Sequence, residues 1–238
     1  MNGALSRTAR SLVDDPKHGP MPMLLLALTV LTGVIDAVSI LSLGRVFVAN
    51  MTGNVVFVGF ALVGIPGFSL SASLFALLGF LVGALAAGAI VPRVGGTRGA
   101  LLRGTVLAEL VIVTIAMIIA ITAGRHAHDA SVDAMAAVCA LAMGGQNTVV
   151  RRLAVPDLTT TVLTMTLTGL AADVPAGAEM PVIVRRVLAV STMLVGAIVG
   201  AVLVRDHGAQ GGLILAVAIL AAVGVTTMLL GRQLTDLE

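Results

Sequence analysis

The chain has no tryptophan, no tyrosine and a single cysteine among its 238 residues, and only 11% of them are charged. One cysteine, Cys139, excludes an internal disulfide and any metal or cluster site built from several cysteines. Nucleic-acid binding is not expected, because no basic patch has aromatic side chains interleaved with it. The scarcity of charge also argues against a soluble domain, in which roughly a quarter of the residues are charged.

The chain is instead rich in apolar residues. Hydrophobic residues make up 58% of the chain, and its mean hydropathy is +1.09. The apolar runs are long and continuous, whereas a membrane β-barrel has segments of about ten residues that alternate in polarity. We therefore predict an all-α, polytopic helical membrane protein with membrane lipids among its partners.

The number of spans depends on two short apolar segments. The apolar segments lie at about 23–43, 52–65, 72–91, 101–122, 132–150, 157–172, 183–204 and 211–230. Six have the length of roughly 20 residues that a span needs, while 52–65 and 157–172 are short. If these two segments enter and leave the membrane on the same side, eleven Lys and Arg residues lie on the inside and three on the outside. If all eight segments span, the Lys and Arg residues are divided equally between the two sides. Because positive charge favours the cytoplasmic side, we predict six full spans plus two short broken or re-entrant helices.

The same count places both termini on the cytoplasmic side of the membrane. Residues 1–22 are polar and are predicted to form a flexible cytoplasmic tail. Residues 23–238 are predicted to form a single membrane domain. Its first half covers about 23–122 and its second half about 132–231.

The two halves resemble each other in the placement of small and polar residues. Gly33 and Asp36 in the first long segment correspond to Gly144 and Asn147 in the fourth, a shift of 111 in both cases. Three spans per half would invert the second half relative to the first, which is a recurring design of secondary transporters. We predict such a 3+3 inverted repeat, with chance agreement between two Gly/Ala/Leu-rich stretches as the alternative.

Asp36 lies in the middle of the apolar stretch Leu24–Leu43. A carboxylate at that depth costs at least about 2.5 kcal/mol on insertion scales, so it marks a polar cavity or a partner. On a helix it shares a face with small and hydroxyl residues, which are Thr29, Thr32, Gly33 and Ser39. We interpret Asp36 as a proton, cation or solute site, and a structural hydrogen bond to a neighbouring helix is the alternative.

Further polar residues at the short segments complete the predicted site for a solute or ion. Asn50, Thr52 and Asn54 begin the first short segment, where a half-helix would point its free N–H groups into the membrane. An ordinary N-cap at the membrane surface is the alternative there. In the second half the candidates are Gln146, Asn147, Thr161 and Thr164. These threonines could instead bond only to their own helix.

Other features are given lesser roles. Glu109 is expected to reach the interface near Arg103, as long side chains at span ends do. The small-residue faces around Gly83 and Gly196 are packing surfaces through which a homo-oligomer could form. His126 and His128 belong to a solvated outer loop, and we expect no metal and no cofactor.

The segment from Thr32 to Gly59 resembles the YoaK-like family of bacterial inner-membrane proteins. The resemblance rests on Gly33, Asp36, Ser39, Gly44 and Phe47, on the block Val48-Ala49-Asn50-Met51-Thr52-Gly53-Asn54 and on Gly145-Gln146-Asn147. It extends diffusely over about residues 23–230. It implies a multi-span membrane protein and supplies no substrate, because the family has no settled activity.

Three functions remain open at this point. The first is a small secondary transporter of a small polar solute, coupled to protons, with its site at the midplane between the two halves. A channel-like pore is the second, and a membrane scaffold or accessory protein without transport is the third. An enzyme is not expected, because the sequence has no nucleophile motif, phosphate loop or paired-histidine metal motif.

Overall fold

The computed structural model describes residues 15, 18–94, 96–124, 128–161, 163–175, 177 and 179–235. Most of the predicted tail, residues 1–14, 16 and 17, therefore lies outside the described residues. The described chain forms helices and no strand, apart from one isolated bridge between Asp15 and Gly19. This confirms the all-α prediction for the described part.

Six long helices and three shorter ones follow one another along the described part of the chain. The long helices are α2 (Met21–Ser42), α4 (Leu70–Val94), α5 (Arg98–Ala123), α6 (Asp129–Leu153), α8 (Met180–His207) and α9 (Ala209–Leu229). The shorter helices are α3 (Met51–Leu62), α7 (Leu163–Asp173) and α10 (Gly231–Thr235). Helices α3 and α7 have 12 and 11 residues, about half the length that a span requires.

Local sequence signals set several of these boundaries. The Thr97 hydroxyl accepts a hydrogen bond from the backbone N–H of Ala100 and caps the start of α5. Pro181 lies in the first turn of α8, where its missing N–H costs nothing. Gly208, with a φ of 72°, ends α8 and begins α9, since a residue without Cβ can reverse the chain in one step.

Within the described residues, α2, α4, α5, α8 and α9 are long and apolar enough to cross a membrane. Helix α6 has a similar length of 25 residues but is less apolar, because it carries Asp133, Gln146 and Asn147. Large apolar side chains such as Leu85 and Val111 point outward. The chain is therefore a multi-pass helical membrane protein.

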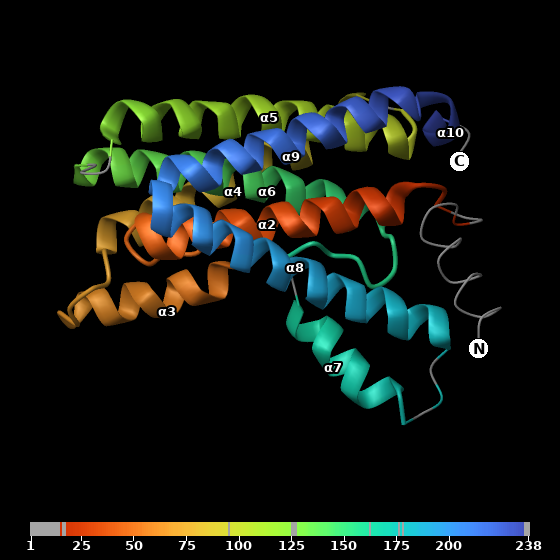
Figure 1. The fold of residues 1–238 in the computed structure, drawn as a ribbon, viewed down its shortest axis with the longest axis horizontal. Helices are drawn as coiled ribbons and strands as arrows, with labels where there is room; N and C mark the ends of the chain where they lie inside the picture. Colours follow the sequence, from red (N-terminus) through yellow and green to blue (C-terminus); the bar gives the residue numbers. More distant parts are fainter. Residues whose placement is uncertain are drawn as a thin grey trace.

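The long helices alternate in direction, and the short ones do not alter that alternation (Figure 1). At one end of the molecule Arg98 of α5 contacts His18, and Arg185 of α8 forms an ion pair with Asp15 at 2.9 Å. At the other end Ser71 of α4 donates to Asp133 of α6 at 3.1 Å. Helix α2 thus ends where α4 begins, and α6 ends where α8 begins. Helices α3 and α7, together with the loops that precede them, bring the chain back to the end of the molecule at which the preceding long helix finishes.

Glycines let the long helices pack closely in two pairs. Gly33 of α2 lies against the backbone of α8, and Gly144 of α6 lies against the backbone of α4. Gly83 of α4 and Gly196 of α8 face the backbones of α6 and α2 in return. The small-residue faces proposed for a homo-oligomer are therefore occupied within the chain. A second copy would need a different surface.

Candidate functional site

The polar stripe of α2 faces protein, as its composition predicts. Asp36 is 8% exposed, and Thr29, Thr32 and Ser39 are fully buried. The three hydroxyls donate to carbonyl oxygens of their own helix, with Thr29 reaching Leu25 at 2.8 Å. Because these hydroxyl donors are already used, they are not available to hydrogen-bond the Asp36 carboxylate.

Asp36 finds one such partner at the start of α3. Its Oδ2 accepts a hydrogen bond from Asn50 Nδ2 at 3.1 Å, and its Oδ1 has no hydrogen-bond partner among the described residues. Asn50 stands at the N-cap position of α3, but its side chain does not cap the helix. A buried acceptor without a partner is uncommon and costly. The free oxygen can take a proton or a hydrogen-bond donor, as the sequence-based interpretation requires.

A matching contact occurs in the second half. Asn147 of α6 accepts a hydrogen bond from the hydroxyl of Thr161, which lies two residues before the start of α7. The two partners are 14 residues apart, as are Asp36 and Asn50. In each half, a polar side chain in the first long helix thus holds the residue at the beginning of the short helix.

Gln146 joins these contacts to α5. With its amide oriented by the hydrogen-bond network, the nitrogen donates to both Glu109 oxygens, at 2.7 and 3.1 Å, and the oxygen accepts from Thr160 at 3.1 Å. The end of the amide that faces Thr160 also lies 3.3 Å from the Thr32 hydroxyl. Gln146 therefore touches α2, α5 and the segment before α7 at one depth.

Glu109 is the functional candidate that the sequence reasoning placed wrongly. Its side chain is 2% exposed and points inward, so it does not reach the interface near Arg103. It lies 11 residues into α5, about 17 Å along the helix axis at 1.5 Å per residue. That depth, rather than the nearby arginine, was the signal that would have identified it.

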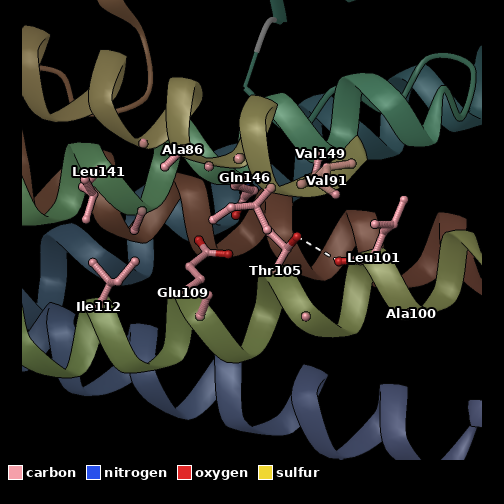
Figure 2. A pocket seen from close by; sticks show the side chains of 17 residues that line it. Ala86, Val91, Ala100, Leu101, Thr105, Glu109, Ile112, Leu141, Gln146 and Val149 are labelled. Carbon is pink, nitrogen blue, oxygen red and sulfur yellow. Dashed lines mark hydrogen bonds between the residues drawn. The ribbon is translucent and has the colours of Figure 1, made fainter. Parts of the chain in front are cut away.

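Glu109 and Gln146 open onto a cavity of about 340 Å³ between α4, α5 and α6 (Figure 2). Most of the lining is Gly, Ala, Val, Leu and Ile, and the polar side chains are Thr105, Glu109 and Gln146. Helices α4 and α5 both pack on α6 but scarcely touch each other within the described residues. The cavity is therefore the gap between α4 and α5, and α6 forms its base.

The remaining predicted site residues lie apart from this cluster. Asn54 is buried, but both ends of its amide bond the backbone of Phe47, at N–H and C=O, so it holds the loop before α3. Thr52 and Thr164 are exposed on α3 and α7. Their roles toward a solute stay predictions. No group of three or more His, Cys, Asp or Glu residues within the described chain could hold a metal, and His126 lies outside it.

Comparison with known proteins returns one family of unknown function and one relative named as a transmembrane protein. The DUF1275 family, described as "Protein of unknown function", matches residues 24–226. A relative from Bacillus subtilis (strain 168), the "UPF0700 transmembrane protein YoaK", is 32% identical over 151 residues. That match covers 63% of this chain and 66% of the relative. No solved structure matches the chain. The resemblance to the YoaK-like family is therefore confirmed.

Proposed function

This chain belongs to the DUF1275 family of unknown function, and we propose that it is a small secondary transporter with two inverted halves. Asp36 would couple the movement of a small polar solute to a proton, at a midplane site between the halves. The observation that carries this proposal is the pair of equivalent contacts, Asp36 with Asn50 and Asn147 with Thr161. The residue numbers of the second contact are those of the first plus 111, with 147 corresponding to 36 and 161 corresponding to 50.

The close packing of the helices supports the same equivalence. A Cβ at Gly33 would meet the carbonyl of Met193 and the N–H of Ala197, and one at Gly144 would meet the same groups of Phe80 and Ala84. Those partners shift by 113, from 80 to 193 and from 84 to 197. Agreement of contacts between helices is harder to obtain by chance than agreement of composition. It therefore favours a repeat over coincidence.

We propose α6 as the sixth span. Its amides, which lower its apolarity, are bonded to Glu109, Thr160 and Thr161 rather than turned outward. Polar side chains in a spanning helix are tolerated when they face other helices. Six spans give three per half, so the second half is inverted, and both termini lie on the cytoplasmic side of the inner membrane.

The two halves differ at one place that bears on transport. Helices α4 and α5 stand apart and enclose the cavity, while their counterparts α8 and α9 pack against each other. Transporters with inverted repeats expose their site to alternate sides as one half changes its packing relative to the other. We infer that the open α4/α5 and closed α8/α9 arrangement is one of the two states of such a cycle.

Proton coupling is tested in proteoliposomes that contain a pH-sensitive dye. A panel of small polar solutes is added outside, and a transported solute is expected to give a saturable change of internal pH. Asp36→Asn keeps the shape and hydrogen bonding of the side chain but cannot exchange a proton, so this signal should vanish. Asp129→Asn makes the same change at an exposed carboxylate, so it is the matched control and should behave as the parent.

The same measurement separates the alternatives. Flux that grows without saturation and ignores the pH gradient would indicate a channel-like pore. Absence of flux for every solute, in protein whose thermal unfolding is unchanged by all of them, would indicate a scaffold or accessory protein. If Asp36→Asn folds and remains as strongly coupled to pH as the parent, the role given to this carboxylate is wrong.

A further inference from the structure

We propose that the cavity between α4, α5 and α6 binds an amphipathic organic ammonium ion, with its charged head on Glu109 and its apolar body among the aliphatic side chains. This goes beyond the proposed transport of a polar solute, because the cavity is separate from Asp36, which does not line it. The inference concerns binding only, and it holds whether or not the chain moves a solute.

The first argument is charge. Glu109 is 2% exposed, and no cationic side chain of the described residues forms an ion pair with it. The two arginines nearest to it along the chain are directed elsewhere, since Arg103 is exposed and Arg98 bonds His18. None of the lining residues is basic. A carboxylate in such surroundings is stabilised by a cation that a ligand brings.

The second argument is the type of hydrogen-bonding group that the cavity leaves free. The Thr105 hydroxyl donates to the Leu101 carbonyl at 2.9 Å, as Figure 2 shows, so its oxygen can only accept. The Gln146 nitrogen is already used by Glu109, and the Gln146 oxygen by Thr160. What faces the cavity is therefore a set of acceptors. An ammonium group has donors and no acceptor, which is the complementary pattern.

The third argument is shape and polarity. Thr105 and Glu109 lie one turn apart on α5, so both acceptors are at the same side of the cavity. The rest of the lining is aliphatic, with Leu101, Ile112 and Leu141 among its larger members. A volume of about 340 Å³ is at the small end of ligand pockets in proteins. An ammonium head with a short alkyl or aryl body fits this division, whereas an anion or a sugar does not.

Octylammonium is the probe that tests the site. The protein is placed in nanodiscs of zwitterionic lipid, and radiolabelled octylammonium is measured by equilibrium dialysis, with empty nanodiscs subtracted. We expect saturable binding of one molecule per chain. Octan-1-ol and octanoate, which have the same chain without the positive charge, should compete at least tenfold more weakly.

Two variants locate the bound molecule. Glu109→Gln removes the charge but keeps the size, and should weaken octylammonium binding at least tenfold. Gly145→Leu places a leucine side chain in the cavity from α6, since a Cβ there meets only the Gly83 carbonyl, at 4.0 Å. It should abolish binding while leaving Glu109 in place. Gly88→Leu is the matched control, because a Cβ there meets nothing and Gly88 does not line the cavity.

Several results would overturn the proposal. Binding without saturation, equal competition by octan-1-ol, or unchanged binding in folded Glu109→Gln would each do so. Folding of each variant is checked by heating with a thiol-reactive dye, because the single buried Cys139 becomes accessible only on unfolding. If Glu109→Gln does not fold, Gly145→Leu and the competition series on the parent protein decide. Asp36→Asn should bind octylammonium as the parent does, so failure here leaves the transport proposal standing.

Discussion

Gly33 of α2 and Gly144 of α6 each lie against the backbone of a helix from the other half of the chain. Neither has space for a Cβ, because the facing carbonyl and N–H groups belong to backbone that cannot rotate away. The two halves are thus joined by glycine contacts rather than by interlocking large side chains. Helix pairs in membranes commonly use small residues in this way.

We expect Gly144→Ala to destabilise the protein, because the added methyl group would force α4 and α6 apart. Overpacking of this kind costs about 1–3 kcal/mol. Thermal unfolding followed through Cys139 measures the effect, and Gly88→Ala is the matched control because it meets no neighbour. Equal unfolding temperatures for the two variants would show that α4 and α6 are not packed as described.

Side-specific labelling tests the six-span topology. In a Cys139→Ala background, Ser71→Cys should react with an impermeant thiol reagent added to intact cells, and Pro156→Cys should react only after the membrane is opened. Both positions are exposed, and neither substitution removes a charge. Eight spans predict the reverse pattern for both positions, so a single pair of measurements distinguishes the two topologies.

Arg186 holds α7 against α8. It donates to Asp157 at 2.7 Å and to Asp173 at 2.8 Å, and its guanidinium lies where a Cβ of Gly169 would be. A hydrogen bond between charged groups is stronger where it is shielded from water, so the contact with Asp157 is expected to contribute more than the one with the half-exposed Asp173.

Arg186→Gln should therefore speed hydrogen exchange in α7 severalfold, because the contacts with Asp157 and Asp173 are lost. Arg205→Gln, at the exposed pair with Asp206, should change exchange very little and serves as the control. Exchange in α7 that does not respond to Arg186→Gln would mean that packing, not this ion pair, holds the helix.

Asn54 is expected to act on the loop before α3 rather than on a solute. Asn54→Ala would leave the backbone N–H of the half-buried Phe47 without its bond of 2.8 Å, which costs up to about 3 kcal/mol. We expect a lower unfolding temperature, while the neighbouring, exposed Thr52→Ala should have no effect. A loss of transport in Asn54→Ala with unchanged stability would instead support the predicted contact with a solute.

Much of the architecture was predictable from the sequence. Long apolar runs with few charges require helices in a membrane, because backbone groups in lipid must be satisfied within their own segment. The two short helices were predicted from the length of their segments, and the arginines predicted that they return to the side from which they came. Asp36 and Asn50 were also selected from the sequence as candidate site residues, and the structure places them in contact.

The partners of Glu109 could not be predicted, because they depend on which helices meet. Its neighbour Gln146 is distant in sequence, and the gap above it exists only because α4 and α5 both pack on α6 and not on each other. The small-residue faces were likewise visible in the sequence, but not whether they would meet another copy or the chain itself. Periodicity tells which residues share a face of a helix. The sequence by itself therefore determined that the chain crosses a membrane, where its helices lie and which of their positions are polar. Only the tertiary structure decided which polar groups pair and where a cavity is left, because both depend on which helices approach each other closely.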